Sequence, residues 1–299
     1  MTGVQDRVVD MSKGVDKLIR MQYDQEYEAI LNWLTPIDYA PQQNDYIRRR
    51  QPGTGQWLLD SKEFQTWLDT SKQTLFCPGI PGAGKTIITS IVIKYLFDKF
   101  QHCDIQGDGD IQDRSIQNDG SIGIAYLYCN FRRQNEQKAE ELLASLLKQL
   151  AREHSATPPI LKALYDWHKI KQTRPSFDEI SKALQSVTVM YSTVFIVIDA
   201  LDECQVSDGC RTRLLSEIFN LQIKNGASIF VTSRFIPDIT KTFQGSLSVE
   251  IRASEEDLQK YLDGRILKSE SVVLKSCREE IKTEITKAVN GMYASSLLS

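Results

Sequence analysis

The chain has 299 residues, of which 41% are hydrophobic and 25% charged, a composition that excludes an intrinsically disordered chain. A formal net charge of −3 gives no electrostatic reason to expect nucleic acid or an acidic membrane surface as a partner. The six cysteines form no CxxC pair and only three histidines accompany them, which argues against a zinc-type ligand cluster.

The first residues carry charges throughout and lack the apolar core of a secretory signal. The sequence contains no run of about 18 or more apolar residues, the length that a membrane span needs. The scattered cysteines are typical of reduced thiols. We therefore expect a cytoplasmic protein without a membrane span.

Two helices joined by a connector are expected over the first seventy residues. Apolar residues recur at helical spacing over 4–34, and this helix is an effector remnant, a dimerisation helix or, the preferred interpretation, a helix that simply packs on the body. The polar stretch 35–56, with its prolines and glycines, predicts a connector. A second helix over 57–69 is expected to be capped by Asp60 or Ser61.

From Thr74 onward, short apolar runs alternate with helical stretches. This alternation predicts a parallel sheet covered on both faces, a three-layer α/β sandwich with N-terminal and C-terminal helical extensions. The consecutive apolar residues Val194 to Ile198 indicate a strand buried on both sides. The strands are expected at 74–80, 123–131, 194–198, 228–232 and 247–251, and the helices after 86 and at 136–152, 159–170, 176–190 and beyond 254.

Three regions follow from this organisation. An N-terminal helix and connector occupy 1–50, the sandwich occupies 51–253, and a C-terminal helical segment occupies 254–299. The stretch 104–121 is rich in Asp, Gly, Gln and Asn, and its acidic spacing lacks the closing Glu of a calcium loop. We expect it to be a solvated surface loop.

The sequence GIPGAGKT, Gly79 to Thr86, fits the pattern G-x-x-x-x-G-K-[ST] without deviation and identifies a P-loop NTPase. Its glycines allow backbone N–H groups to approach phosphate oxygens, and the helix that begins at Lys85 directs its positive end at them. Lys85 is expected to bind the β- and γ-phosphates of ATP or GTP, and the Thr86 hydroxyl to bind Mg²⁺. The nucleotide-binding residues that the motif predicts are Gly79, Pro81, Gly82, Ala83, Gly84, Lys85 and Thr86.

A phosphate loop requires a carboxylate at the end of a neighbouring strand to hold Mg²⁺. Asp199 is the first polar residue after the buried run that ends at Ile198. Ligands of open parallel sheets lie outside the carboxyl ends of the strands, where Asp199 falls. We therefore expect the metal ligands to be Thr86 and Asp199.

Three more residues are catalytic candidates. Asp202 or Glu203 can orient the water that attacks the γ-phosphate, although spacing does not decide between them. Arg234 follows the strand SIFVTS and can sense the γ-phosphate through charge-assisted hydrogen bonds. The competing interpretations are solvated acids at a helix start and a surface arginine.

The loop GIPGAGKT, the strand end IVIDALDE and the strand end FVTSR, in this order, resemble the NACHT class of signalling NTPases within the STAND group. The segment 48–68 is also similar, and the resemblance points to the nephrocystin-three-like N-terminal domain of fungal NOD-like receptors, over roughly residues 20 to 290. It implies a nucleotide-controlled switch in which Gly53 to Trp57 pack near the base and ribose, and in which Arg234 is the sensor arginine. Those receptors continue into further domains, so the chain is expected to be a truncated product or a free-standing module.

We expect an Mg²⁺-dependent NTP-binding switch with slow hydrolysis, serving fungal innate immunity or heterokaryon incompatibility. The alternatives are a nucleotide-binding scaffold without useful hydrolysis and a P-loop small-molecule kinase, although the sequence shows no arginine-rich lid. The expected partners are a nucleoside triphosphate and other protein chains, including copies of itself, with no nucleic acid. No guanine-reading NKxD motif is present, which leaves ATP and GTP both open.

Overall fold

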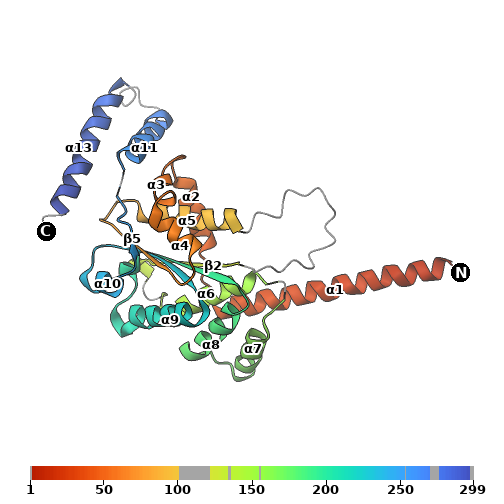
Figure 1. The fold of residues 1–299 in the computed structure, drawn as a ribbon. Helices are drawn as coiled ribbons and strands as arrows, with labels where there is room; N and C mark the ends of the chain where they lie inside the picture. The colour runs from red at the N-terminus through yellow and green to blue at the C-terminus, as the bar shows by residue number, and fades with distance from the viewer. Residues whose placement is uncertain are drawn as a thin grey trace.

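The computed structural model describes residues 2–100, 122–133, 136–154, 156–252, 254–269 and 276–296. The expected surface loop at 104–121 lies outside these residues. The predicted α/β class with a parallel sheet is confirmed (Figure 1). The sheet has five strands, in the spatial order β2 (Ile122–Tyr128), β3 (Thr193–Asp199), β4 (Ser228–Ser233), β1 (Thr74–Pro78) and β5 (Leu247–Ser248).

All four strand pairings are parallel, so the strands end at one edge of the sheet. In this register Pro78 lies opposite Ser233, and Tyr128 lies opposite Asp199. The expectation that the strand before the phosphate loop and the strand of Asp199 are neighbours is wrong, because β4 lies between β1 and β3. Strand order depends on pairings between distant segments, which local periodicity does not encode.

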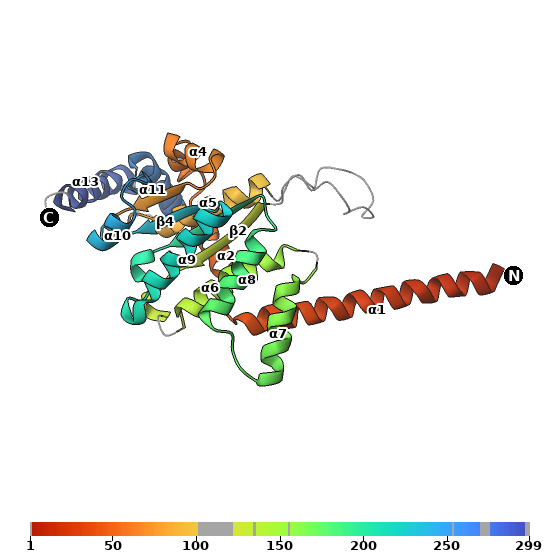
Figure 2. The ribbon, with the colours of Figure 1, turned by 60° about the horizontal axis from the view of Figure 1, so that its bottom comes forward.

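Helices cover both faces of the sheet and extend beyond it at both ends of the chain (Figures 1 and 2). One face carries α2 (Ala40–Arg49), α3 (Gln56–Leu59), α4 (Lys62–Asp69) and α5 (Lys85–Phe100). The other carries α6 (Ala139–Arg152), α8 (Phe177–Thr188) and α9 (Cys210–Asn225), with α7 (Pro159–Lys171) and the end of α1 (Thr2–Leu34) outside them. The remaining elements are α10 (Pro237–Thr242), α11 (Glu255–Lys268), α13 (Arg278–Ser296) and the short 3₁₀ turns at 131–133, 201–203 and 207–209.

The core consists of the strands and the helix faces against them. Val194 to Ile198 are all 1% exposed or less, which confirms a strand buried on both sides. The indole of Trp67 on α4 contacts the rings of Phe195 and Phe230, at centroid distances of 5.2 and 5.8 Å. Ser61 caps α4 by accepting a hydrogen bond from the Phe64 N–H, one of the two expected caps.

The stretch 35–56, expected to be a connector, contains the helix α2. Pro41 lies in its first turn, where the missing N–H has no intrahelical partner to lose. The buried Gln43 amide donates to the carbonyl of Ser90 on α5 at 3.0 Å and so joins the two helices. Tertiary packing thus makes a helix of residues whose composition indicates a loop.

The helix over 4–34 is confirmed, but its expected simple packing holds only for its last third. Tyr27, Ile30, Leu31 and Leu34 face the body, and the last three are fully buried. The rest of α1 extends away from the body in both ribbon views (Figures 1 and 2).

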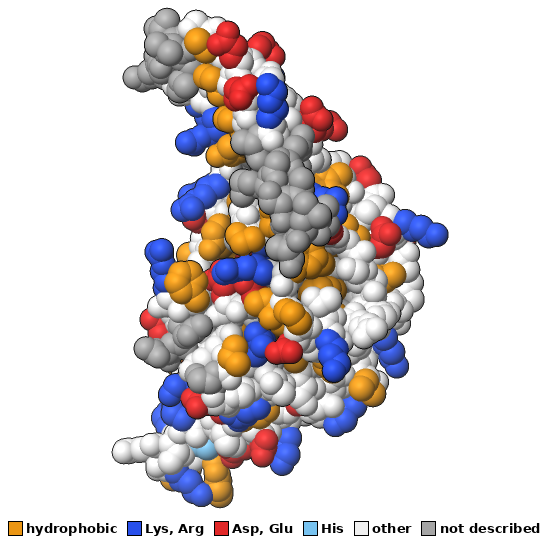
Figure 3. Space-filling model, turned by 90° about the vertical axis from the view of Figure 1, so that its left-hand side faces the viewer, with side chains coloured by type: hydrophobic (Ala, Val, Ile, Leu, Met, Phe, Trp, Pro, Cys, Tyr) orange, Lys and Arg blue, Asp and Glu red, His pale blue; other side chains and the backbone are white. Residues whose placement is uncertain are grey.

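Basic and acidic side chains are interspersed over the face shown in Figure 3, as the small net charge leads one to expect. Within the part of the chain that the structure describes, no helix combines the length and apolar character needed to span a membrane.

Candidate functional site

The phosphate-loop motif connects the end of β1 to the start of α5. Gly82 and Gly84 have φ angles of +80° and +89°, left-handed values that side-chain-bearing residues rarely adopt. Gly79 is needed for a different reason, because an added Cβ would lie 2.5 Å from the carbonyl oxygen of Ile251. The loop therefore has the backbone conformation in which successive N–H groups form an anion-binding concavity.

The Lys85 ammonium lies over this loop. Its Nζ donates to the carbonyl oxygens of Gly79 at 2.8 Å and Ile80 at 2.9 Å. Partial burial lowers the pKa of Lys85 below its ordinary value, while the nearby carboxylates of Asp202 and Asp199 act in the opposite direction. The positive charge is thus placed where phosphate oxygens would contact the loop.

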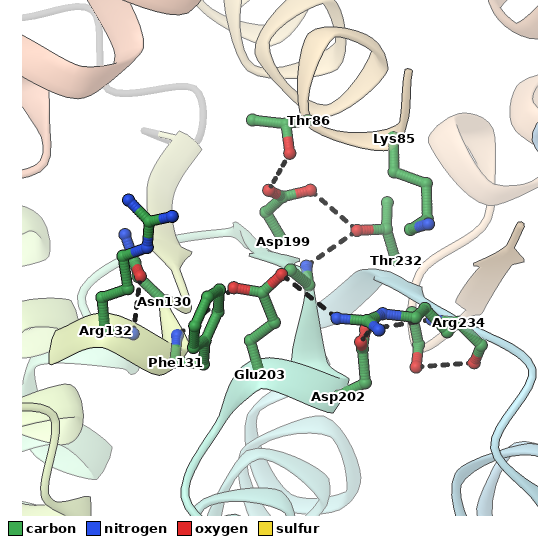
Figure 4. A network of polar contacts seen from close by, with 12 residues as sticks. Lys85, Thr86, Asn130, Phe131, Arg132, Asp199, Asp202, Glu203, Thr232 and Arg234 are labelled. Atoms are coloured by element: carbon green, nitrogen blue, oxygen red, sulfur yellow. Dashed lines mark hydrogen bonds and ion pairs between the residues drawn. The ribbon is translucent and has the colours of Figure 1, made fainter. Parts of the chain in front are cut away.

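Asp199, at the end of β3, is 2% exposed and is held by three hydroxyl groups. Thr86 Oγ1 donates to its Oδ2 at 2.7 Å, and Thr232 Oγ1 donates to its Oδ1 at 2.8 Å (Figure 4). Thr89 Oγ1 also donates to Oδ1, at 2.8 Å. Burial raises the pKa of Asp199, and the hydroxyl hydrogen bonds oppose that shift. A hydroxyl and a carboxylate in contact are hard oxygen donors, so Thr86 and Asp199 fit a magnesium ion.

The backbone turns sharply after Asp199. Ala200 adopts a left-handed conformation, with φ 51° and ψ 51°, and its N–H donates to Thr232 Oγ1 at 2.9 Å. Strained non-glycine residues of this kind cluster at functional sites. Here the turn directs the next two acids, Asp202 and Glu203, toward the end of β4 (Figure 4).

Arg234, directly after β4, contacts both acids. Its Nε lies 2.7 Å from Asp202 Oδ2, its backbone N–H donates to Asp202 Oδ1 at 3.0 Å, and its Nη2 lies 3.7 Å from Glu203 Oε1. The Asp202 side chain is only 3% exposed, whereas that of Glu203 is 25% exposed. Glu203 Oε2 also accepts from the Phe131 N–H at 3.3 Å. The structure therefore brings all three catalytic candidates together.

A cavity of about 470 Å³ lies beside the phosphate loop, and residues Ile80 to Gly84 of the loop form part of its wall. This volume is in the range of small-molecule sites. Thr54, Gly55 and Trp57 line it, in the segment expected near the base and ribose, together with apolar side chains of α5. The rest of the wall comes from α11, which contributes Asp257, Leu258 and Tyr261, from Arg252 and from the segment 49–51.

Sequence reasoning missed several of these residues. Thr89 carried a usable signal, since it is a polar residue one turn beyond Thr86 and so lies on the same face of the helix. Asp257 carried no such signal. Its Oδ2 accepts from the Gly55 N–H at 2.8 Å, but 202 positions separate the two residues, so no sequence pattern connects them. Arg50, which donates to the Thr54 carbonyl from Nε at 3.0 Å, was also missed.

Comparison with known protein families decides the family. A family model described as "Nephrocystin 3, N-terminal" matches residues 53–234, well over half of the chain. The chain belongs to this nephrocystin 3 N-terminal family. It therefore contains a NACHT-like P-loop NTPase domain, and the resemblance seen in the sequence is confirmed. The expected domain limits of 51 and 253 stay a prediction.

No curated protein matches the chain significantly in sequence. The similar solved structures include AMPPCP-bound DnaA from Aquifex aeolicus, at 11% identity and a TM-score of 0.39, covering 77% of this chain and 58% of DnaA. The Orc1 protein of Aeropyrum pernix in complex with DNA has 15% identity and a TM-score of 0.41, with 75% of this chain and 48% of Orc1 covered. DnaA bound to AMPPCP and single-stranded DNA has 12% identity and a TM-score of 0.41, with coverages of 83% and 64%. The chain thus spans less than two thirds of the length of each of these proteins.

The same comparisons correct one expectation. Nucleic acid was excluded as a partner on the basis of net charge, and this exclusion is wrong, because two of the similar structures contain DNA. Net charge describes the whole chain and does not exclude a local basic surface.

Proposed function

We propose that the chain is a nucleotide-controlled switch that binds a nucleoside triphosphate with Mg²⁺ and hydrolyses it slowly. The observation that carries the proposal is the contact between Thr86 of the phosphate loop and the buried Asp199, whose oxygens lie 2.7 Å apart although 113 positions separate them. A turn with no ligand has no need to place a loop hydroxyl on a strand-end carboxylate. By its family we further propose a cytoplasmic signalling role, in innate immunity or heterokaryon incompatibility.

The loop binds the phosphates in this proposal. Its N–H groups and the N-terminus of α5 stabilise the negative charge of the phosphates. Lys85, which donates to the carbonyls of Gly79 and Ile80, would donate to phosphate oxygens instead. Thr86 and Asp199 would hold Mg²⁺, which supplies positive charge to the β- and γ-phosphate oxygens. Pro81 and Ala83, within the loop, shape its path.

The two acids after Asp199, Asp202 and Glu203, have different roles. Both oxygens of Asp202 are bound by Arg234, through its Nε and its backbone N–H, so Asp202 positions the arginine. Glu203 is the more exposed acid and lies at the longer distance of 3.7 Å from Arg234. We therefore assign to Glu203 the general-base role of orienting the attacking water, and to Arg234 the sensing of the γ-phosphate.

The cavity receives the base and ribose. It adjoins Gly82 and Gly84 of the loop, and its walls combine apolar side chains of α5 with Trp57 and Tyr261. Such a wall stacks on either purine, so ATP and GTP are both ligands to be tested.

Replacing Glu203 by Gln tests the catalytic assignment. The amide keeps the size of the side chain and removes the base, so phosphate release from ATP or GTP is expected to fall about 100-fold or more while nucleotide affinity is kept. Asp238→Asn, on exposed α10 and outside the site, is the matched control and is expected to leave turnover unchanged. If the Glu203 variant releases phosphate like the unchanged chain, Glu203 is not the general base. If neither chain releases phosphate, the chain is a binding scaffold and the hydrolytic part of the proposal is wrong.

A further inference from the structure

The part of α1 that extends from the body presents apolar side chains to solvent. Val15, Leu18 and Ile19 are 52%, 67% and 45% exposed, and Met21 and Tyr23 are exposed as well. Helices in proteins owe most of their stability to the packing of an apolar face rather than to their own propensity. The projecting segment therefore needs a partner that the body does not supply.

The body cannot supply it because the two apolar faces of α1 point in different directions. At about 100° per residue, the face of Val15 and Leu18 lies roughly 155° around the helix axis from the face of Tyr27, Leu31 and Leu34. Only the second face is buried against α6 and its neighbours. The first face points away from the body.

The sequence of the projecting segment has the spacing of a coiled-coil seam. Val4, Val8, Met11, Val15 and Leu18 alternate in steps of four and three residues. In a heptad written abcdefg, the two a positions are Val8 and Val15, and position d holds Val4, Met11 and Leu18. Valine at a with leucine at d favours two parallel strands, and Val8, Val15 and Leu18 follow this rule, whereas Val4 at d does not. Gln22 and Gln25 take the next a and d positions, so the seam ends where α1 reaches the body.

The charges of the segment favour a second copy over a membrane. Residues 4–24 contain four aspartates and four basic residues, Asp6, Asp10, Asp16, Asp24, Arg7, Lys13, Lys17 and Arg20, which sum to zero. Helices that lie on anionic membranes carry a basic polar face. Two copies of a neutral helix, by contrast, pair without net repulsion.

We propose that residues 4–21 of α1 form a parallel two-stranded coiled coil with the same residues of a second copy of the chain. Because the seam faces away from the body-docking face, the two bodies lie on opposite outer sides of the paired helices. The coiled coil holds two NTPase domains at the same end of one rod whether or not nucleotide is bound.

Sedimentation of the full-length chain tests the pairing. We expect twice the monomer mass at micromolar concentration, and Leu18→Glu is expected to raise the dimer dissociation constant by about tenfold or more, because it places two carboxylates in the seam. Tyr23→Glu adds the same charge to an exposed apolar residue at position b and is expected to leave the dimer intact. Neither side chain belongs to the core, so both variants are expected to keep the thermal unfolding temperature of the body.

Cysteine substitution tests the orientation. Val15→Cys places two thiols opposite each other at an a position of a parallel pair, so oxidised glutathione is expected to link most chains, being itself reduced to two thiols as the disulfide forms. Lys17→Cys, at the outward c position, is expected to link no more than the unchanged chain.

A monomer at all concentrations overturns the proposal, as do equal effects of the substitutions at Leu18 and Tyr23. So does a monomer that binds vesicles of phosphatidylcholine and phosphatidylserine, which would make the apolar face a membrane anchor.

Discussion

The nucleotide site has two halves that are built in different ways. The phosphate half, the loop with Asp199, lies at the ends of buried strands, and Asp199 is held by three hydroxyls within 2.8 Å. The base half is the cavity, whose walls come from the segment around Gly55 and from α11. Asp257 and Lys260 join these walls, through bonds of 2.8 Å to Gly55 and 3.1 Å to the Gly53 carbonyl. The sheet fixes the first half, whereas a few contacts between distant segments fix the second.

Lys85→Ala is expected to have the largest effect, because it removes the only side-chain ammonium on the phosphate loop motif. A ligand at 100 times its dissociation constant stabilises a protein by about 2.7 kcal/mol, and the variant is expected to lose this stabilisation. Unfolding with and without Mg²⁺ and ATP or GTP measures it. Lys94→Ala, on the exposed side of the same helix, is the matched control and is expected to keep it. If nucleotide stabilises the Lys85 variant as much as the control, the phosphate loop does not bind the nucleotide.

The phosphate half was predictable from the sequence because its chemistry is local. Eight consecutive residues specify the loop, and the position of Asp199 follows from the end of a strongly apolar strand. A parallel sheet then places both at one edge. Even there, the order of the strands was not predictable. Thr232, on the intervening β4, donates a hydrogen bond to Asp199 that the sequence pattern does not indicate.

Of the base half, only the segment Gly53 to Trp57 was predicted, from the family resemblance, and the rest could not be predicted for a physical reason. Its walls pack through contacts between residues about 200 positions apart, and no periodicity connects Asp257 with Gly55. The helix α2, beside this half, was missed because Gln43 and its neighbours gain helical structure from packing on α5 rather than from their own propensity. Motifs encode chemistry at strand ends, whereas a cavity between segments is encoded only by the whole fold.

Thr232→Val tests whether the hydroxyl network fixes the phosphate half. Valine has the same shape but cannot donate to Asp199 or accept from the Ala200 N–H, which stays buried without a partner. We expect the free energy of unfolding to fall by about 1–3 kcal/mol, measured by denaturant titration. Thr66→Val, at an exposed position of α4, is expected to change it by no more than about 0.5 kcal/mol. A similar small change at Thr232 would show that the sheet holds Asp199 without its hydroxyls, which weakens the contrast between the halves.

Asp257→Ala is expected to have the smallest effect, and it acts on the base half alone. The substitution removes the acceptor of the Gly55 N–H, a partly exposed bond worth about 1 kcal/mol, so nucleotide affinity is expected to fall about fivefold. Glu255→Ala removes the same charge from an exposed position in the first turn of α11 and is expected to leave affinity unchanged. Calorimetric titration with ATP and GTP at fixed Mg²⁺ measures both variants. If the Asp257 variant keeps its affinity while the Lys85 variant still loses binding, the phosphate loop binds the nucleotide but the cavity does not hold the base. The contacts between α11 and the segment at Gly55 would then serve only to attach the C-terminal helices.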